Sequence, residues 1–120
     1  MKRLISIVAF AIFPALAADV AGDWKVVGDI GTVHVNRVCT LKQDGDKISG
    51  ACKNSQGEVQ LTGTVSGNAV TWQYTTTLQG RSIPMVYKAT VESAEKMTGK
   101  MEIVGENLIP PGEFTATRQH

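Results

Sequence analysis

The chain has 120 residues, among which 12 basic side chains nearly balance 11 acidic ones. Such a length holds one domain with a modest hydrophobic core. The charges form no basic stripe, which is the electrostatic footprint of a protein that binds nucleic acid, so we expect no nucleic-acid partner.

The first 17 residues have the three-part layout of a secretory signal peptide. Met1-Lys2-Arg3 is basic, the segment from Leu4 to Phe13 is almost entirely apolar, and Ala15-Leu16-Ala17 is a small-x-small cleavage site. The apolar run is well short of the roughly 20 residues that span a bilayer as a helix. We expect cleavage after Ala17, a single mature domain of residues 18–120, a periplasmic or secreted location, and no membrane role after export.

The mature chain begins with two segments that alternate like strands. Trp24 and Val26 share one face of the first segment, which we expect to end at Gly28-Asp29-Ile30-Gly31. Residues 33–36 then alternate as a short lead-in to a second strand over residues 37–43.

Export places Cys39 and Cys52 in an oxidising compartment, where paired thiols normally form a disulfide. A zinc site would need two further ligands, and the chain offers only His34 and His120, so we expect no metal. A redox pair usually has C-x-x-C spacing, whereas twelve residues separate these cysteines. The pair is therefore expected to be a structural disulfide.

The turn at Asp44-Gly45 sets the register of the hairpin that carries both cysteines. Three pairs of residues then face one another: Gln43 with Ile48, Leu41 with Gly50, and Cys39 with Cys52. Directly opposed residues of antiparallel strands have Cα atoms about 4.5–5.5 Å apart, which suits a disulfide. Closing a loop this short contributes roughly 3 kcal/mol to stability in the chain-entropy model.

The rest of the chain continues as alternating segments separated by turn residues. These segments cover residues 47–53, 59–65, 70–75, 83–91, 97–103 and 114–116. Eight strands joined mostly by short connections predict an all-β fold, an eight-stranded antiparallel up-and-down barrel, because closure removes exposed edges. Gly50, Gly63 and Gly99 fall at interior positions, where they would ease the bending of a small barrel. An open two-sheet sandwich is the alternative.

Four segments resemble the lipocalin and avidin-type (calycin) barrels: Gly22-Asp23-Trp24, Asp46–Gly50, Leu61–Thr64 and Gly112–Arg118. The resemblance covers nearly all of the mature domain. In calycins a G-x-W near the N-terminus faces an arginine on the last strand and closes the barrel floor. The resemblance therefore implies a stabilising role for Trp24 and Arg118. Biotin-binding barrels surround their ligand with tryptophans, and this chain has only Trp24 and Trp72.

The chain also has a weaker resemblance to secreted bacterial inhibitors of metalloproteases, which are small eight-stranded barrels with one disulfide between early strands. That resemblance implies a module that binds an exported protein. Their inhibitory segment is the N-terminus, which here is only residues 18–21, where the sequence indicates no rigid anchor.

The leading interpretation is a module that binds a small apolar or amphiphilic molecule in or at the mouth of the barrel. Trp72, Tyr74, Met85 and Tyr87 would line the site, and Arg37 and Arg81 would supply polar contacts at its rim. The same apolar side chains could instead fill the core, because an eight-stranded barrel is just wide enough to be packed solid or to hold one small ligand. We expect no cofactor.

A small enzyme acting at the mouth is a further alternative, with His34, Arg37 or Tyr87 as its reactive groups. The chain has no G-x-S-x-G motif and both cysteines are assigned to the disulfide, so we assign no catalytic residues.

Leu108 and Ile109 are apolar residues in the last connection, directly before Pro110-Pro111. The prolines prevent this segment from pairing as a strand. The two side chains could form a lid over the mouth, a contact for a partner, or a plug packed against the barrel.

Overall fold

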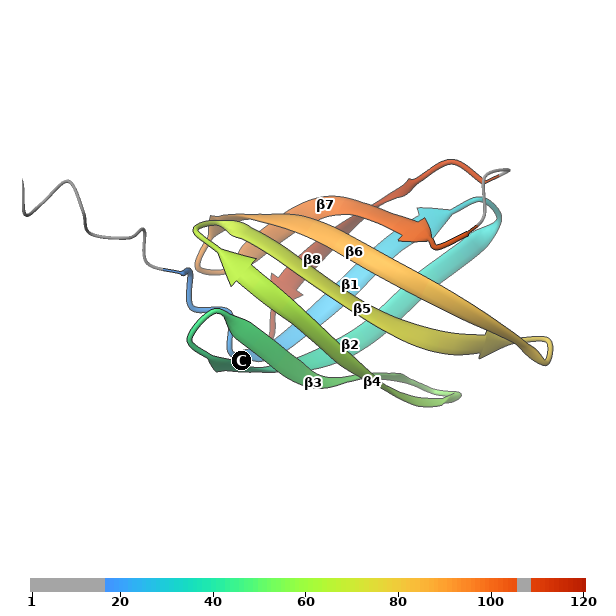
Figure 1. Cartoon of the computed structure of the whole chain (residues 1–120), viewed down its shortest axis with the longest axis horizontal. Coiled ribbons are helices and arrows are strands. Elements are labelled where there is room, and N and C mark those ends of the chain that lie inside the picture. The colour runs from blue at the N-terminus through green and yellow to red at the C-terminus, as the bar shows by residue number, and fades with distance from the viewer. Residues whose placement is uncertain (1–16, 106–108) are drawn as a thin grey trace, which may run out of the picture.

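The computed structural model describes residues 17–105 and 109–120. These residues form eight strands: β1 (Gly22–Ile30), β2 (Val33–Asp44), β3 (Lys47–Asn54), β4 (Gly57–Ser66), β5 (Ala69–Leu78), β6 (Arg81–Ser93), β7 (Lys96–Ile103) and β8 (Gly112–Arg118). Each strand pairs antiparallel with the next, and β8 returns to pair with β1, which closes the barrel (Figure 1). The predicted up-and-down barrel is confirmed, and the open sandwich is excluded.

The first strand is longer than the sequence predicts. β1 continues through Gly28 to Ile30, and the chain turns only at Gly31, whose φ is 59°. The expected break is wrong because Gly28 serves strand packing: a Cβ there would collide with the Glu113 carbonyl oxygen and the Phe114 backbone of β8. The predicted lead-in is likewise the first part of β2.

The hairpin of β2 and β3 has the predicted register, in which Cys39 faces Cys52, Leu41 faces Gly50, and Gln43 faces Ile48. Cys39 and Cys52 form a disulfide, with Cα atoms 3.9 Å apart, and both residues are buried. Neither cysteine of the chain is free. Such a bond is typical of a protein in a non-reducing, exported compartment.

Two of the interior glycines allow neighbouring strands to approach closely. A Cβ at Gly63 would collide with the Thr71 carbonyl oxygen of β5, and one at Gly99 would collide with the Lys88 carbonyl oxygen of β6. The strands of this narrow barrel therefore coil tightly at points where no side chain separates them.

An aromatic layer fills the middle of the barrel. The ring of Trp72 stacks on that of Tyr87 with centroids 5.2 Å apart, and Phe114 meets both rings edge-on at 5.5 and 5.1 Å. Met97 and Met101 are fully buried in the same core. At this level aromatic and methionine side chains occupy the interior.

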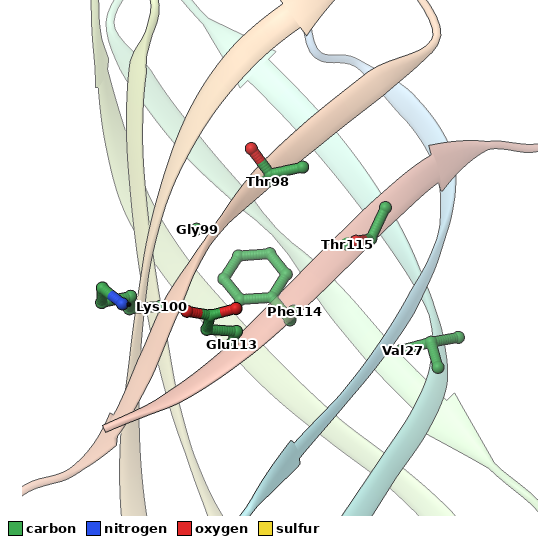
Figure 2. A pocket seen from close by; sticks show the side chains of 7 residues that line it. All are labelled: Val27, Thr98, Gly99, Lys100, Glu113, Phe114 and Thr115. Carbon is green, nitrogen blue, oxygen red and sulfur yellow. Dashed lines mark hydrogen bonds and ion pairs between the residues drawn. The ribbon is translucent and has the colours of Figure 1, made fainter. Parts of the chain in front are cut away.

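The outer wall of β7 and β8 shows the expected alternation. Phe114 points into the barrel, whereas Thr98, Lys100, Glu113 and Thr115 lie on the outer face (Figure 2). A shallow hollow of about 400 Å³ lies among them, but it is open to solvent. Its charged groups already pair, since Lys100 Nζ lies 3.3 Å from Glu113 Oε2. The two charged groups of this hollow therefore neutralise each other.

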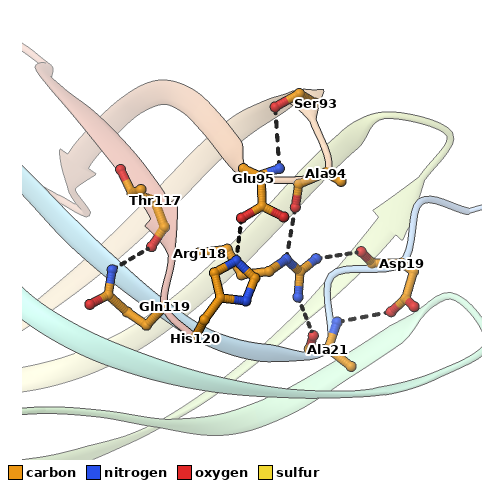
Figure 3. A network of polar contacts seen from close by, with 9 residues as sticks. All are labelled: Asp19, Ala21, Ser93, Ala94, Glu95, Thr117, Arg118, Gln119 and His120. Carbon is orange, nitrogen blue, oxygen red and sulfur yellow. Dashed lines mark hydrogen bonds and ion pairs between the residues drawn. The ribbon is translucent and has the colours of Figure 1, made fainter.

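Arg118 seals one end of the barrel, which we call the floor. Its guanidinium lies over the ring of Trp24, with Cζ 4.5 Å from the ring centroid. It donates hydrogen bonds to the carbonyl oxygens of Ala94 (2.7 Å), Ala21 (2.7 Å) and Asp19 (3.0 Å) (Figure 3). A charged side chain with this many partners stabilises the fold and has little capacity left for a ligand.

The segment before β1 is also held against the floor. Val20 is fully buried, and its carbonyl oxygen accepts a 2.9 Å hydrogen bond from Trp24 Nε1. Gln43 Oε1 accepts from the Val20 amide and its Nε2 donates to the Ala18 carbonyl, while the Ala18 amide donates to the Gly67 carbonyl at 3.0 Å. This anchor, which the sequence does not indicate, depends on Gln43, a residue distant in the chain.

Candidate functional site at the mouth of the barrel

The end of the barrel opposite the floor, which we call the mouth, contains a cavity of about 290 Å³. The β1–β2, β3–β4 and β5–β6 turns lie at this end (Figure 1). Its lining combines an apolar wall with a polar rim: Ile30, Val33, Val35, Ile83, Met85, Ile103 and Ile109 on one hand, and Arg37, Asn54, Gln56, Thr76 and Arg81 on the other. A few polar groups converging on an apolar hollow is the usual composition of a small-molecule site.

Arg37 is the charged group placed deepest in this mouth. It lies on the same face of β2 as Cys39, so its side chain points into the barrel, and it is half-buried. Nη2 donates to Thr76 Oγ1 at 3.2 Å, and Cζ lies 5.4 Å from the centroid of the Tyr74 ring. None of the ion pairs formed by the described residues includes Arg37. A guanidinium has five N–H donors, so most of its donor capacity is available to an anion.

Tyr74 lies between the cavity and the aromatic layer beneath it, and its hydroxyl meets that of Tyr87 in this layer. Their hydroxyl oxygens lie 2.5 Å apart, and both side chains are buried. Burial raises the pKa of both phenols, and the neighbouring Tyr74 raises that of Tyr87 further, while the hydrogen bond from Tyr87 and the charge of Arg37 partly offset the effect at Tyr74. Both hydroxyls are therefore neutral at physiological pH and form an uncharged base to the cavity.

Of the six residues that the sequence proposes for ligand binding, four line the cavity and two lie beneath it. Arg37, Tyr74, Arg81 and Met85 line the cavity together. Trp72 and Tyr87 lie in the packed layer below, each 1% exposed, and neither is part of the cavity lining. Trp72 Nε1 is buried and has no hydrogen-bond partner among the described residues.

The residues considered for catalysis lie in different surroundings. His34 is exposed at the rim, where its Nδ1 lies 2.8 Å from Asp29 Oδ1 across the β1–β2 hairpin. Tyr87 is buried in the core and raised in pKa. His34 and Arg37 both line the mouth cavity, and none of the hydrogen bonds among the described residues joins them to each other or to Tyr87.

Ile109 lies half-buried against the core and closes one side of the cavity. Leu108, its predicted companion, lies outside the described residues. Sequence reasoning did not single out several lining residues, among them Val35, Thr76, Ile83 and Ile103. Their alternation was visible, but nothing in it indicates that their strands extend beyond the packed core.

Comparison with known proteins finds no protein-family model and no curated protein that matches this chain. Residues 17–105 and 109–120 contain no helix that is both long and apolar enough to cross a membrane. Across the same residues, no three His, Cys, Asp or Glu side chains cluster as a metal site would require.

Proposed function

We propose that this protein binds a small amphiphilic anion at the mouth of the barrel, with the anionic head on Arg37 and the apolar tail against the aliphatic wall. The observation that carries the proposal is a half-buried guanidinium inside a largely apolar cavity, where it donates a hydrogen bond to a hydroxyl and forms no ion pair with a described residue. Desolvating a cation without a counter-charge is unfavourable, and a bound anion would offset that penalty with charge-assisted hydrogen bonds.

The cavity also limits the size of the ligand. Its volume of about 290 Å³ is at the lower end of the range for small-molecule pockets. Tyr74 and the aromatic layer beneath it prevent a tail from passing deeper. A short or medium acyl chain suits this space better than a long one.

We infer that the protein performs this role after export. Support comes from the signal-peptide layout of residues 1–17 and from the Cys39–Cys52 disulfide. Cleavage after Ala17 would also leave the amino group of Ala18 where it donates to the Gly67 carbonyl.

Calorimetry with sodium octanoate, and with octanol as the neutral analogue, tests the site. Octanoate should bind the monomer and octanol should bind more weakly, because only the carboxylate pairs with Arg37. Arg37→Gln should weaken octanoate binding at least about tenfold, the loss expected for a charge-assisted hydrogen bond. Lys25→Gln, an equal charge change at an exposed residue of β1, should leave binding unchanged.

Equal affinity for octanoate and octanol would contradict the proposed contact with the guanidinium. The same conclusion would follow if Arg37→Gln and Lys25→Gln behaved alike.

A further inference from the structure

The wall of the barrel is open between β4 and β5 on the side of the mouth. The pairing of these strands begins next to their turn, where Ser66 faces Ala69. It ends where Thr62 faces Gln73. β4 nevertheless continues to Gly57 and β5 to Leu78. We call the two unpaired edges, residues 57–61 and 74–78, the fork; their hairpins diverge at the right of Figure 1.

A cavity of about 200 Å³ lies in the fork. Gly57, Glu58 and Val59 line it from β4, and Thr76 and Thr77 line it from β5. Asn54, Gln56 and Arg37 complete the lining. The guanidinium that borders the mouth therefore also borders the fork.

The edge of β5 directs main-chain hydrogen-bonding groups into the fork. The Pro84 carbonyl accepts from the Val104 amide at 2.9 Å, so the main chain of Pro84 is turned toward β7. Thr75 pairs with Pro84, and in an antiparallel ladder its N–H and C=O must then point away from β6. The same holds for Thr77, two residues further along the strand.

The edge of β4 presents a matching set. The Val65 amide donates to the Asp46 carbonyl at 2.8 Å, which turns the main chain of Val65 toward the β3 side. The main-chain N–H and C=O groups of residues in the alternate positions therefore point toward β5. Glu58 and Gln60 are among these residues. Each of these residues supplies one donor and one acceptor to the fork.

We propose that the fork binds the C-terminal end of an extended peptide, whose main chain pairs with the strand edges and whose terminal carboxylate lies on Arg37. Unpaired strand edges are templates for an added strand. The junction at Thr62 and Gln73 stops an inserted strand from continuing along the sheet, so a chain end suits this place. The charge of Arg37 selects a carboxyl end over an amino end.

The mouth beside the fork suits an apolar last residue, because Val35, Ile83 and Met85 line it. This inference rests on the carboxylate contact at Arg37 that the proposed function also uses. It extends that function by naming a peptide C-terminus as the natural carrier of the anion and by adding main-chain recognition, which octanoate cannot use.

Fluorescence anisotropy tests this with dye-labelled Thr-Ser-Val-Thr-Leu carrying a free C-terminal carboxylate, compared with the C-terminal amide of the same peptide. The acid should bind, and the amide should bind at least about tenfold more weakly. Arg37→Gln should weaken binding of the peptide acid by a similar factor. Equal binding of acid and amide, or no binding of the acid, would overturn the proposal.

Thr77→Pro separates strand pairing from the carboxylate contact. The Thr77 amide points into the fork, so proline there removes no hydrogen bond to β6 but blocks an added strand. The variant should lose peptide binding at least about tenfold and weaken octanoate binding far less, because octanoate has no main chain to pair with the strand edge. Unchanged peptide binding by Thr77→Pro would overturn the proposal.

N-methylation of alternate peptide amides gives a second test that does not depend on how the variant folds. One of the two methylated phases should lose binding, and retention in both would overturn strand pairing. Peptide binding without octanoate binding would refute the mouth as an amphiphile site while supporting the fork, and the reverse would refute the fork. Self-association of the protein that competes with the peptide would show a second copy as the occupant and overturn the peptide proposal.

Discussion

At the scale of single residues, two arginines with aromatic neighbours differ in how their guanidinium groups are bonded. Arg118 donates to three carbonyl oxygens and covers Trp24, so the folded chain itself satisfies its charge. Arg37 also lies over an aromatic ring, that of Tyr74, but among the described residues its side-chain hydrogen bond goes to the Thr76 hydroxyl. The number of partners among the described residues, rather than the residue type, distinguishes the arginine that holds the floor from the one proposed to bind a ligand.

The Tyr74–Tyr87 pair predicts a specific response to alkaline pH. Burial raises the pKa of both phenols, whereas unfolded tyrosine ionises near pH 10. Above about pH 10 the folded chain therefore binds more protons than the unfolded chain, and the free energy of unfolding falls as the pH rises. The contribution of the pair is fully present below that pH.

The chain has only these two tyrosines, so tyrosinate absorbance reports on them alone. The absorbance should stay flat past about pH 10 and then rise in one step together with the loss of the circular-dichroism signal. A gradual rise while the barrel remains folded would show that at least one phenol is accessible, which would contradict the sealed base of the cavity.

At the scale of elements, Gly63 controls how closely β4 approaches β5 just before the fork. Gly63→Ala should lower the free energy of unfolding by about 1–3 kcal/mol, because the added Cβ collides with the Thr71 backbone carbonyl, which cannot rotate away. Thr64→Ala, at the next and exposed position, should change stability by less than about 0.5 kcal/mol. Urea denaturation measures both, and equal stabilities would contradict the tight crossing.

The elements differ in how far the sequence predicts them. The β2–β3 register follows from a two-residue turn and a strict period of two, so it is confirmed pair by pair. The predicted end of the first strand at Gly28 is wrong, because a glycine that allows close approach of a neighbouring strand cannot be told in sequence from one that forms a turn.

The site is predicted only in part, for a related reason. Alternation tells which face of a strand is interior, and it correctly directs Arg37, Tyr74 and Met85 inward. It does not tell the height of a residue along the barrel axis, which depends on strand tilt and stagger. Trp72 and Tyr87 also lie on the interior face of their strands, but one layer deeper than the cavity.

At the scale of the whole molecule, the two ends of the barrel are built differently, with a floor that is sealed and a mouth that is open. Signal cleavage after Ala17 would remove one small side chain packed against the core and leave the hydrogen bonds of Ala18 at the floor intact. Intact mass spectrometry of the exported protein should give a chain that starts at Ala18 and is two hydrogens lighter than its reduced form. Two free thiols would contradict the inferred export of an oxidised chain, and a start beyond Val20 would contradict the expected cleavage site.

The sealing of the floor also constrains the order of folding. Every hairpin in the meander joins neighbours in sequence, but the hydrogen bond from Arg118 to the Ala21 carbonyl joins residues 97 positions apart. Contacts between neighbours form quickly, whereas those between distant segments must first overcome the entropy of closing a long loop. The seam between β1 and β8 therefore forms late, and until the last strand arrives the first strand keeps an exposed edge that another chain could capture.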